Sequence, residues 1–421
     1  MHHFTYRNGT LHAEGVDLRE IADSVGTPFY CYSTATLERH YRVFSQAFDG
    51  ADILVCYSIK ANSNLAVLKT LGNLGSGMDV VSEGELRRAR AAGVSPEKIV
   101  FSGIGKTRDE MAYALNEGIY AFNVESEAEL AALNEVAMQA DIRACVAFRV
   151  NPDIDPKTHK KISTGKAEDK FGVPYERARG LYKEAAELPG INPCGIHMHI
   201  GSQITDLKPF GDAFALLREL AGQLMEDGRT LKFINFGGGL GVPYKTDDPV
   251  PPHPDEYAKI VLAAAKDLGV KLLFEPGRMI AANAGILVTR VLYTKTGAAK
   301  SYIIVDAGMN DLIRPTLYEA WHDIIPVEEL LRDTPGQTTD VVGPVCETGD
   351  YLALDRKLPE YSGGDLMAVL TAGAYGAVQS STYNTRPLIP EVLVNGGDFA
   401  VIRPRPTFDD MLGQDKLPDW L

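Results

Sequence analysis

The stretch ILVCYSIKAN, residues 53–62, reads as a buried β-strand that runs directly into a lysine. Apolar residues lead through Tyr57, Ser58 and Ile59 to Lys60. A lysine at the end of a strand ordinarily points into solvent, so this position alone carries little information. Its meaning depends on how the other strands of the chain end.

Seven further short apolar runs follow by residue 278, separated by helical patterns such as SEGELRRARAAG. They are MDVVSEGE, KIVFSGIGKT, YAFNVES, CVAFRVN, GIHMHIGSQ, FINFGGG and LLFEPGR. This alternation predicts parallel strands joined by helical crossovers, and eight such units predict a (β/α)8 TIM-like barrel. An open doubly wound sheet is the alternative, but the similar polar or glycine-rich endings favour closure. In a barrel these endings meet at the C-terminal mouth, where active sites lie, and Lys60 becomes one of a ring of functional groups.

The second part of the chain has a different sequence pattern, in which strand-like runs follow one another with few long helical patterns. The runs SYIIVDAG, TDVVGPVCE, DLMAVLTAG, PEVLVNG and DFAVIRPRP predict an antiparallel β-domain of the β-barrel or Greek-key type. Near the start, Asn8-Gly9 is a hairpin signal and PFYCYS resembles another strand. We therefore expect a barrel domain at residues 35–284 and a β-domain built from both chain ends, residues 1–34 and 285–421.

Composition excludes several classes of function. The chain has 421 residues and a formal net charge of −14, which argues against nucleic acid or an anionic membrane surface as a partner. No apolar run reaches membrane-spanning length, and the first residues, MHHFTYRNGTLHAEG, lack the pattern of a signal peptide. These features predict a cytoplasmic protein.

The five cysteines are widely spaced and form no C-x-x-C pair, which excludes a zinc knuckle and makes a disulfide framework unexpected. Cys31, Cys56, Cys145 and Cys194 lie in apolar strand-like runs, so we predict that they are small core residues. Cys346 differs, because it lies in the turn-rich segment GPVCETGD.

A glycine-rich loop follows one of the predicted strands. In FGGGLG, residues 236–241, the glycines allow backbone N–H groups to approach an anion, although a tight turn would also use them. The spacing does not match a dinucleotide fingerprint, and Pro243 interrupts the start of a following helix. A phosphate site at the barrel mouth is the better interpretation.

Two other strand ends carry polar groups. His197 and His199 are two apart on a predicted strand and would share a face, as a metal pair or, for His199, as a ring against a flat cofactor. The remaining histidines lie mostly outside the strand ends, so we expect no metal. Glu275 and Arg278 could be a surface ion pair, but at a barrel mouth the carboxylate can hold a protonated ring nitrogen and the arginine a carboxylate.

A lysine, a phosphate loop, a stacking ring and a carboxylate for a ring nitrogen together indicate pyridoxal 5′-phosphate (PLP). Lys60 is then the residue that binds the cofactor's aldehyde. Cofactor and apolar walls around Lys60 can lower its pKa and supply the free amine.

The motifs YSIKAN, HIGSQ, GGGLG, EPGR, RPTLYEAWH, GPVCETGD and AGAYG together resemble the alanine-racemase-like class of PLP enzymes. Within that class the chain is similar to the diaminopimelate decarboxylase family over essentially its whole length. The resemblance implies a PLP barrel followed by a β-domain, in a head-to-tail homodimer with shared active sites. It also implies decarboxylation of meso-2,6-diaminopimelate to L-lysine, the last step of lysine biosynthesis.

The resemblance also assigns roles to individual residues. Lys60 binds PLP, with Asp79 as a supporting group, His199 stacks on the ring, and Glu275 pairs with the ring nitrogen. Cys346, from the partner subunit, is the proton donor. The phosphate is held by Ser202, Gly238, Gly239, Gly277, Arg278 and Tyr375, and the substrate by Arg278, Arg314, Tyr318, Glu347 and Tyr375.

Three alternatives stay open. A PLP decarboxylase of ornithine, arginine or another basic amino acid shares the fold and most motifs, but RPTLYEAWH and CETGD favour a substrate with a second amino-carboxylate. An amino-acid racemase needs a second base, and CETGD stands where that base is expected. A non-catalytic regulator would lack Lys60 or Cys346, and both are present.

Overall fold

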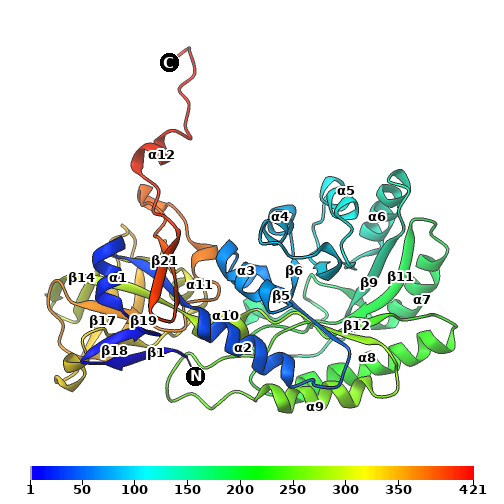
Figure 1. The fold of residues 1–421 in the computed structure, drawn as a ribbon, viewed down its shortest axis with the longest axis horizontal. Coiled ribbons are helices and arrows are strands. Elements are labelled where there is room, and N and C mark those ends of the chain that lie inside the picture. Colours follow the sequence, from blue (N-terminus) through cyan, green and yellow to red (C-terminus); the bar gives the residue numbers. More distant parts are fainter. Residues whose placement is uncertain (1) are drawn as a thin grey trace. The chain divides into compact units, whose positions relative to one another are not determined.

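The computed structural model describes residues 2–421, which divide into two compact units (Figure 1). The barrel unit comprises residues 38–243 and 249–280. The β unit comprises the residues up to Leu37, Tyr244–Asp248 and Ala281–Leu421. It therefore contains both ends of the described chain.

The barrel unit is a closed ring of parallel strands. Its strands are β5 (Ile53–Ser58), β6 (Gly77–Val80), β7 (Ile99–Phe101), β8 (Ala121–Val124), β9 (Ala144–Asn151), β11 (Ile191–His197), β12 (Phe233–Asn235) and β13 (Lys271–Phe274). They follow one another in chain order, β13 pairs with β5, and β8 pairs with β9. All eight predicted strands are confirmed, and the closed ring excludes the open sheet. The short β10 (Val173–Pro174) pairs with the last two residues of β9.

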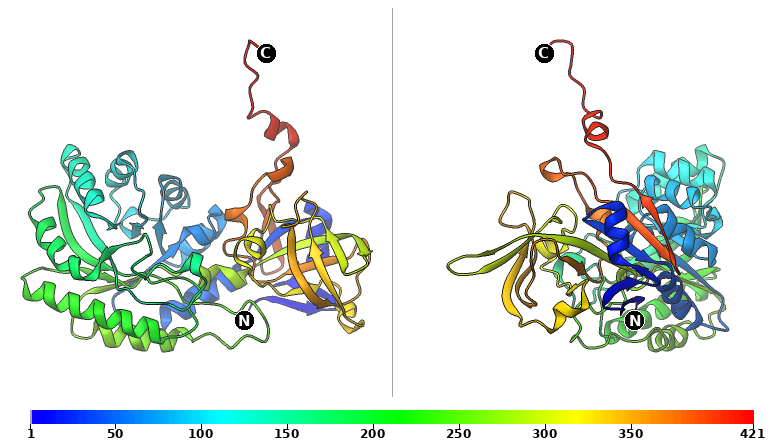
Figure 2. Two further views of the ribbon diagram at one scale, coloured as in Figure 1. Left: turned by 180° about the vertical axis from the view of Figure 1, so that it is seen from behind. Right: turned by 60° about the vertical axis from the view of Figure 1, so that its left-hand side comes forward.

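Helices connect these strands and lie outside them (Figures 1 and 2). Those between the strands are α3 (Leu65–Asn73), α4 (Glu83–Ala91), α5 (Arg108–Glu117), α6 (Glu127–Gln139), α7 (Tyr175–Ala186), α8 (Lys208–Glu226) and α9 (Pro254–Ala265), with α2 (Thr34–Gln46) before β5 and α10 (Arg278–Ala281) after β13. Ser82, Thr107 and Ser126 cap α4, α5 and α6 by accepting a hydrogen bond from a backbone N–H of the first turn. Each capped helix begins soon after the preceding strand ends. The segments between strand and helix are therefore short loops at the mouth of the barrel.

The β unit is built around a mixed sheet. Its strands and helices are β1 (Phe4–Arg7), β2 (Thr10–Ala13), β3 (Val16–Asp17), α1 (Leu18–Val25), β4 (Phe29–Ser33), β14 (Gly285–Thr296), β15 (Ser301–Val305), α11 (Arg314–Tyr318), β16 (Ile324–Pro326), β17 (Gln337–Val342), β18 (Tyr351–Leu358), β19 (Leu366–Val369), β20 (Glu391–Asn395), β21 (Asp398–Arg403) and α12 (Phe408–Leu412). The sheet order is β18-β17-β15-β14-β4-β20-β21, and β19 pairs with β14 and β16. Most pairs are antiparallel as expected, but β15–β17 and β4–β20 are parallel. The sequence patterns did not predict β14, β16 or β18.

The N-terminal segment contributes β4 to this sheet, whereas β1, β2 and β3 form a small sheet of their own. Strand β4 pairs with β14 on one side and with β20 on the other. Asn8 and Gly9 form the predicted two-residue hairpin between β1 and β2, with φ values of 51° and 82°. Two successive positive φ angles are typical of the type I′ turn that Asn-Gly favours.

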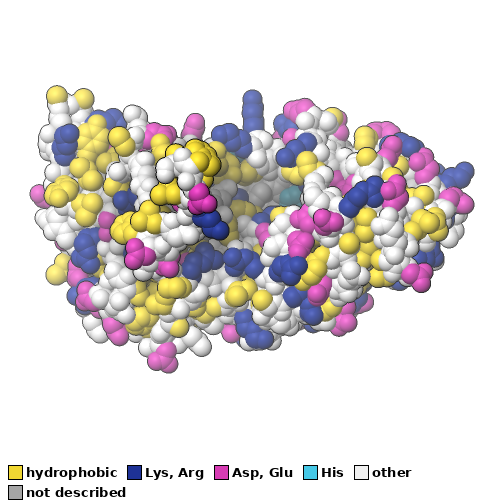
Figure 3. Space-filling model, turned by 90° about the horizontal axis from the view of Figure 1, so that it is seen from above, with side chains coloured by type: hydrophobic (Ala, Val, Ile, Leu, Met, Phe, Trp, Pro, Cys, Tyr) yellow, Lys and Arg dark blue, Asp and Glu magenta, His cyan; other side chains and the backbone are white. Residues whose placement is uncertain are grey.

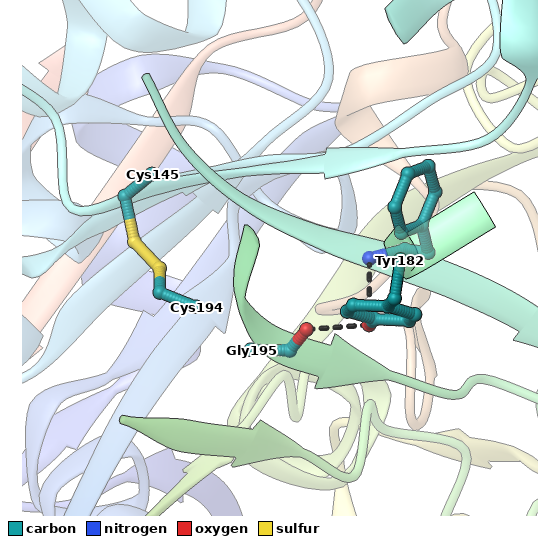
Figure 4. The surroundings of a disulfide bond; sticks show 5 residues. Cys145, Tyr182, Cys194 and Gly195 are labelled. Atoms are coloured by element: carbon teal, nitrogen blue, oxygen red, sulfur yellow. Dashed lines mark hydrogen bonds between the residues drawn. A yellow bond between two sulfur atoms is a disulfide. The ribbon is translucent and has the colours of Figure 1, made fainter. Parts of the chain in front are cut away.

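The cysteine prediction is wrong for two residues. Cys145 on β9 and Cys194 on β11 form a disulfide, with their Cα atoms 6.0 Å apart (Figure 4). They are 49 residues apart in sequence, and only the pairing of β9 with β11 makes them neighbours. The register of β11 shifts between Pro193 and Gly195, at Cys194 itself, and Tyr182 donates a hydrogen bond to the carbonyl of Gly195 at 2.5 Å. Cys31 and Cys56 are buried thiols as predicted, and Cys346 is an exposed one.

Surface features bear on possible partners. No helix within residues 2–421 is both long and apolar enough to cross a membrane. Basic and acidic side chains are intermixed on the face drawn in Figure 3. After β21 the chain extends away from the strands of the β unit (Figures 1 and 2), and Leu417 and Trp420 there are 87% and 82% exposed.

Candidate active site

Lys60 lies just beyond the end of a barrel strand. Strand β5 ends at Ser58, and Lys60 is the central residue of a single 3-10 turn, Ile59–Ala61. Its Nζ donates a hydrogen bond to Oδ2 of Asp79 at 2.6 Å. The lysine side chain is 39% exposed whereas that of Asp79 is completely buried. The hydrogen bond therefore connects an amine that is accessible at the barrel mouth with a carboxylate in the barrel interior.

Asp79, on β6, is fixed by hydroxyl groups from both neighbouring strands. Ser58 donates to its Oδ2 at 2.8 Å, and Ser102 donates to its Oδ1 at 2.7 Å. Burial and the charge of Glu275 raise the pKa of Asp79, while Lys60 acts in the opposite direction. With both oxygens bonded, the carboxylate cannot rotate freely, and it holds the lysine amine in one direction.

Glu275, which follows β13, is a buried carboxylate held by two amides. Asn123 and Asn235 donate to its Oε1 at 2.9 and 2.6 Å. Its Oε2 lies 3.3 Å from Nε2 of His197, within ion-pair distance but outside hydrogen-bond geometry. Burial would raise the pKa of Glu275, but His197 and Lys60 outweigh that effect and hold the pKa well below its ordinary value. The carboxylate is therefore ionised, as a partner of a protonated ring nitrogen must be.

Only one of the two histidines lies on the strand itself. Strand β11 ends at His197, which is 1% exposed beside Glu275, and His199 lies beyond the strand end and is partly exposed. Nδ1 of His199 accepts a hydrogen bond from the backbone N–H of Gly238 at 3.1 Å. The surrounding protein atoms and the charge of Arg149 lower the pKa of His199 well below its usual value. His199 is therefore a neutral ring with a fixed orientation.

The glycine loop after β12 requires glycine because other backbone lies against it. A Cβ on Gly238 would lie 2.2 Å from the carbonyl oxygen of Glu275. Gly239 has a φ of +115°, and a Cβ there would lie 2.6 Å from the carbonyl oxygen of Gly201. The loop therefore passes directly between the strand ends that carry His199 and Glu275.

An arginine and a hydroxyl lie together at the same mouth. Arg278, at the start of α10, is 6% exposed, and its Nη2 and Nε donate to Oγ of Ser202 at 3.1 and 3.3 Å. Gly277, just before it, packs against the side chains of Ser58 and Ala61, where an added Cβ would lie 3.0 Å away. A buried guanidinium beside a serine hydroxyl is suited to an anion.

The other predicted site residues belong to the β unit. Arg314 begins α11 and is 5% exposed, and its Nη1 donates to Nε2 of His322 at 2.7 Å. Its guanidinium carbon lies 4.4 Å from the centre of the Tyr244 ring. Tyr318 ends the same helix, where Nε2 of Gln379 donates to its hydroxyl at 3.2 Å. The buried arginine is thus held in place by two rings.

Cys346 and Glu347 are exposed on the turn between β17 and β18. The backbone N–H of Cys346 donates to Oδ1 of Asn384 at 3.0 Å. Tyr375, after β19, has a positive φ of 57°, a conformation in which non-glycine residues are uncommon and which often marks a functional turn. These residues are therefore on loops, where binding groups are common.

The residues that surround Glu275 and Asp79 were not predicted from the sequence. Ser102, Asn123 and Asn235 each stand at or just after the end of a barrel strand, in IVFS, AFNV and FIN. Their position at strand ends was a usable signal, because it is the same signal that singled out Lys60. Within residues 2–421 no group of three or more His, Cys, Asp or Glu side chains could hold a metal ion.

Comparison with known proteins agrees with this geometry. Residues 34–282 match the family model described as pyridoxal-dependent decarboxylase, pyridoxal binding domain. The diaminopimelate decarboxylase of Vibrio cholerae is 50% identical over 407 residues, 96% of each chain. The chain belongs to the diaminopimelate decarboxylase family.

Solved structures of this family have the same fold. The Helicobacter pylori enzyme complexed with L-lysine is 40% identical, with a TM-score of 0.91 over 94% of this chain and 99% of that one. The enzyme of M. jannaschii complexed with L-lysine is 37% identical, with a TM-score of 0.94 over 99% of this chain and 98% of that one. The TIM-like barrel with a β-domain and the PLP-dependent decarboxylase class, both predicted from the sequence, are confirmed.

The residues at the barrel mouth fit PLP. Lys60 supplies an amine, Glu275 an ionised carboxylate, and Arg278 with Ser202 an anion site, which are the groups that the aldehyde, ring nitrogen and phosphate of the cofactor require. Nδ1 of His197 and Oδ1 of Asn123, both close to Glu275, are buried without a hydrogen-bond partner among the described residues. PLP is the cofactor of this family member.

Proposed function

We propose that this chain converts meso-2,6-diaminopimelate to L-lysine and carbon dioxide, the last step of lysine biosynthesis. The observation that carries the proposal is the cluster at one barrel mouth, where the Lys60 amine contacts a buried Asp79 and an ionised Glu275 lies nearby. Relatives of this identity named diaminopimelate decarboxylase support the choice of substrate.

At the barrel mouth we assign cofactor contacts residue by residue. Lys60 holds the cofactor covalently through Nζ, His199 lies against its ring, and Glu275 keeps the ring nitrogen protonated. When bound, PLP accepts the electron pair that the departing carboxylate leaves on the α-carbon. Because its N–H is bonded to His199, Gly238 orients that ring in our proposal. The phosphate contacts are then Ser202, Gly239, Gly277, Arg278 and Tyr375.

The β unit supplies most of the substrate contacts and the proton. Diaminopimelate carries a second amino-carboxylate, which needs both a cation and an anion for recognition. Arg314 supplies the cation and Glu347 the anion, while Arg278, Tyr318 and Tyr375 complete the set. The Cys346 thiol then gives a proton to the α-carbon after carbon dioxide has left.

We further propose that two copies of the chain form a homodimer with shared active sites and that the enzyme works in the cytoplasm. Cys346 and Glu347 are exposed and therefore accessible to another chain, which supports the proposal. The proposed domains are residues 35–284 for cofactor binding and residues 1–34 with 285–421 for the β-domain.

The direct test is an assay of the purified, PLP-loaded protein with meso-diaminopimelate, with lysine and carbon dioxide measured as products. Arg314→Ala and Glu347→Ala should each lower kcat/KM while PLP stays bound, since loss of one charged partner of a desolvated group costs about 2–5 kcal/mol, roughly 30-fold or more. Arg7→Ala, at an exposed arginine of the same unit, is the matched control. Turnover of ornithine or arginine but not diaminopimelate would contradict the proposal.

A further inference from the structure

A buried carboxylate, that of Asp350, connects the two loops of the β unit that carry candidate site residues. Asp350 is 3% exposed. Its Oδ2 accepts a hydrogen bond from the backbone N–H of Val345, and its Oδ1 accepts one from the backbone N–H of Met309, both at 2.6 Å. Val345 directly precedes Cys346, and Met309 lies in the turn that leads into α11.

Glycines enclose this carboxylate. A Cβ on Gly343 would lie 2.5 and 2.6 Å from the two Asp350 oxygens, and a Cβ on Gly308 would lie 3.2 Å from both. The same Cβ on Gly343 would lie 2.6 Å from the Cα of Gly308. The two loops therefore touch at their glycines, and the aspartate fills the remaining space.

The main chain closes the same turn. The N–H of Asp350 donates to the carbonyl of Glu347 at 3.0 Å, and the N–H of Gly343 donates to the carbonyl of Asp350 at 3.3 Å. Thr316 of α11 donates through its hydroxyl to the carbonyl of Gly349 at 2.6 Å. Of all these bonds, only those of the Asp350 side chain hold both the residue before Cys346 and the start of the α11 turn.

From this arrangement we propose that Asp350 is a positioning residue, which aims Cys346 for proton transfer by binding the Val345 and Met309 amides. The inference rests on the proposed role of Cys346 in decarboxylation. The position of the Arg314 guanidinium depends less on the Asp350 carboxylate, because His322 and Tyr244 hold it in place. Loss of Asp350 should therefore affect proton transfer more than substrate retention.

The sharpest variant is Asp350→Asn, which keeps the size of the side chain. An amide has one acceptor oxygen, so its NH2 group must face either the Val345 or the Met309 N–H, donor against donor. Asp355→Asn is the matched control, because Asp355 is exposed and its positive φ of 51° suits asparagine.

Two measurements on the PLP-loaded enzyme test the proposal. In Asp350→Asn, amide hydrogen exchange should be at least about tenfold faster at Val345 and Met309 and unchanged in the barrel unit. At saturating diaminopimelate, kcat should fall at least about tenfold, and KM should change less than about threefold. In a Cys346→Ala background the same substitution should change kcat by less than about twofold, because residues that act as a unit are not additive.

Each contrary result has a definite meaning. If kcat stays within about twofold of the wild type although both amides exchange faster, or if the loss is as large in the Cys346→Ala background, Asp350 does not act through Cys346 and the proposal is overturned. Unchanged exchange at the two amides also overturns it. Absence of diaminopimelate turnover in the wild type rejects the proposed function, whereas the exchange comparison still decides whether Asp350 holds both loops.

A second variant guards against a failure of Asp350→Asn to fold. Gly343→Ala keeps the aspartate but pushes a methyl group against its carboxylate, so it should reproduce the local exchange change and the loss of kcat. Gly397→Ala, where an added Cβ meets nothing within 4 Å, is its control and should leave both unchanged. A Gly343→Ala enzyme with wild-type kcat would overturn the proposal independently.

Discussion

The Lys60 amine owes its direction to one buried carboxylate. Asp79 binds it at 2.6 Å, and two serine hydroxyls also donate to the same carboxylate. A lysine on a flexible stem would otherwise sample many directions, and ordering such a side chain costs up to about 2 kcal/mol. Asp79 therefore reduces the entropy that is lost when the amine binds the cofactor.

Lys60 should be the lysine that carries PLP. Borohydride should fix the cofactor covalently and bleach the yellow enzyme, and peptide mapping should find the adduct on Lys60. Lys60→Ala should abolish turnover even where some PLP stays bound, while Lys69→Ala, on α3, is the control. Recovery of the adduct on any other lysine would contradict the assignment.

Glu85, on α4, should make stability depend on pH. Burial raises its pKa from 4.5 to about 7, although the charge of Lys60 opposes the shift. Below about pH 4.5 the carboxyl is protonated in folded and unfolded chains alike. As pH rises towards 7 the unfolded chain releases this proton first, so the free energy of unfolding falls.

Glu85→Gln should remove this dependence, and its amide oxygen can still accept the Val81 N–H that now donates to Glu85 at 2.8 Å. Without cofactor, the Tm of Glu85→Gln minus that of the wild type should be larger at pH 8 than at pH 5. Glu97→Gln, at an exposed glutamate, is the control. If the Tm of Glu85→Gln differs from that of the wild type by the same amount at pH 5 and pH 8, Glu85 does not titrate in this range.

At the scale of elements, the strand ends were the predictable part of the site. Lys60 and Glu275 follow apolar runs whose endings mark the mouth of a parallel barrel. The Cys145–Cys194 bond was not predictable, because it depends on the register of β11 against β9, which shifts at Cys194. The contact of Asn123 with Glu275 was not predictable either, because β8 and β13 are not neighbours in the barrel and their side chains meet only in the folded interior. Strand β14, Gly285–Thr296, was not among the predicted strands, although it begins at the boundary predicted for the β-domain.

The glycine loop after β12 should tolerate no side chain at Gly238. Gly238→Ala would place a methyl group 2.2 Å from the carbonyl oxygen of Glu275, so the loop must move and release its bond to His199. PLP affinity, measured by fluorescence titration, should fall at least about tenfold, which corresponds to 1.4 kcal/mol.

Gly222→Ala is the matched control for this prediction. It lies within α8 with nothing within 4 Å of the added methyl group, and alanine in a helix interior is favoured over glycine by roughly 0.5–1 kcal/mol. This control should bind PLP normally and be slightly more stable. Wild-type PLP affinity in Gly238→Ala would show that the loop does not shape the cofactor site.

For the whole molecule, the central question is which chain completes which active site. Lys60 belongs to the barrel unit and Cys346 to the β unit, where its thiol is exposed on a turn. A core thiol would instead lie among apolar neighbours, as Cys31 and Cys56 do. An exposed thiol held by a built turn is consistent with action on a second copy of the chain.

Mixing two inactive variants tests this sharing. Cys346→Ala should lose about 10²–10⁴-fold in kcat, as expected for loss of a general acid, yet keep PLP on Lys60. Lys60→Ala should be inactive because it lacks the cofactor linkage.

If Cys346 acts across the dimer, a heterodimer of the two variants contains one site with both residues intact. Random reassortment of equal amounts should then restore about a quarter of wild-type activity, because half of the two-fold dimers are mixed and each has one intact site. No recovery, with subunit exchange shown by mass spectrometry, would mean that each chain completes its own site.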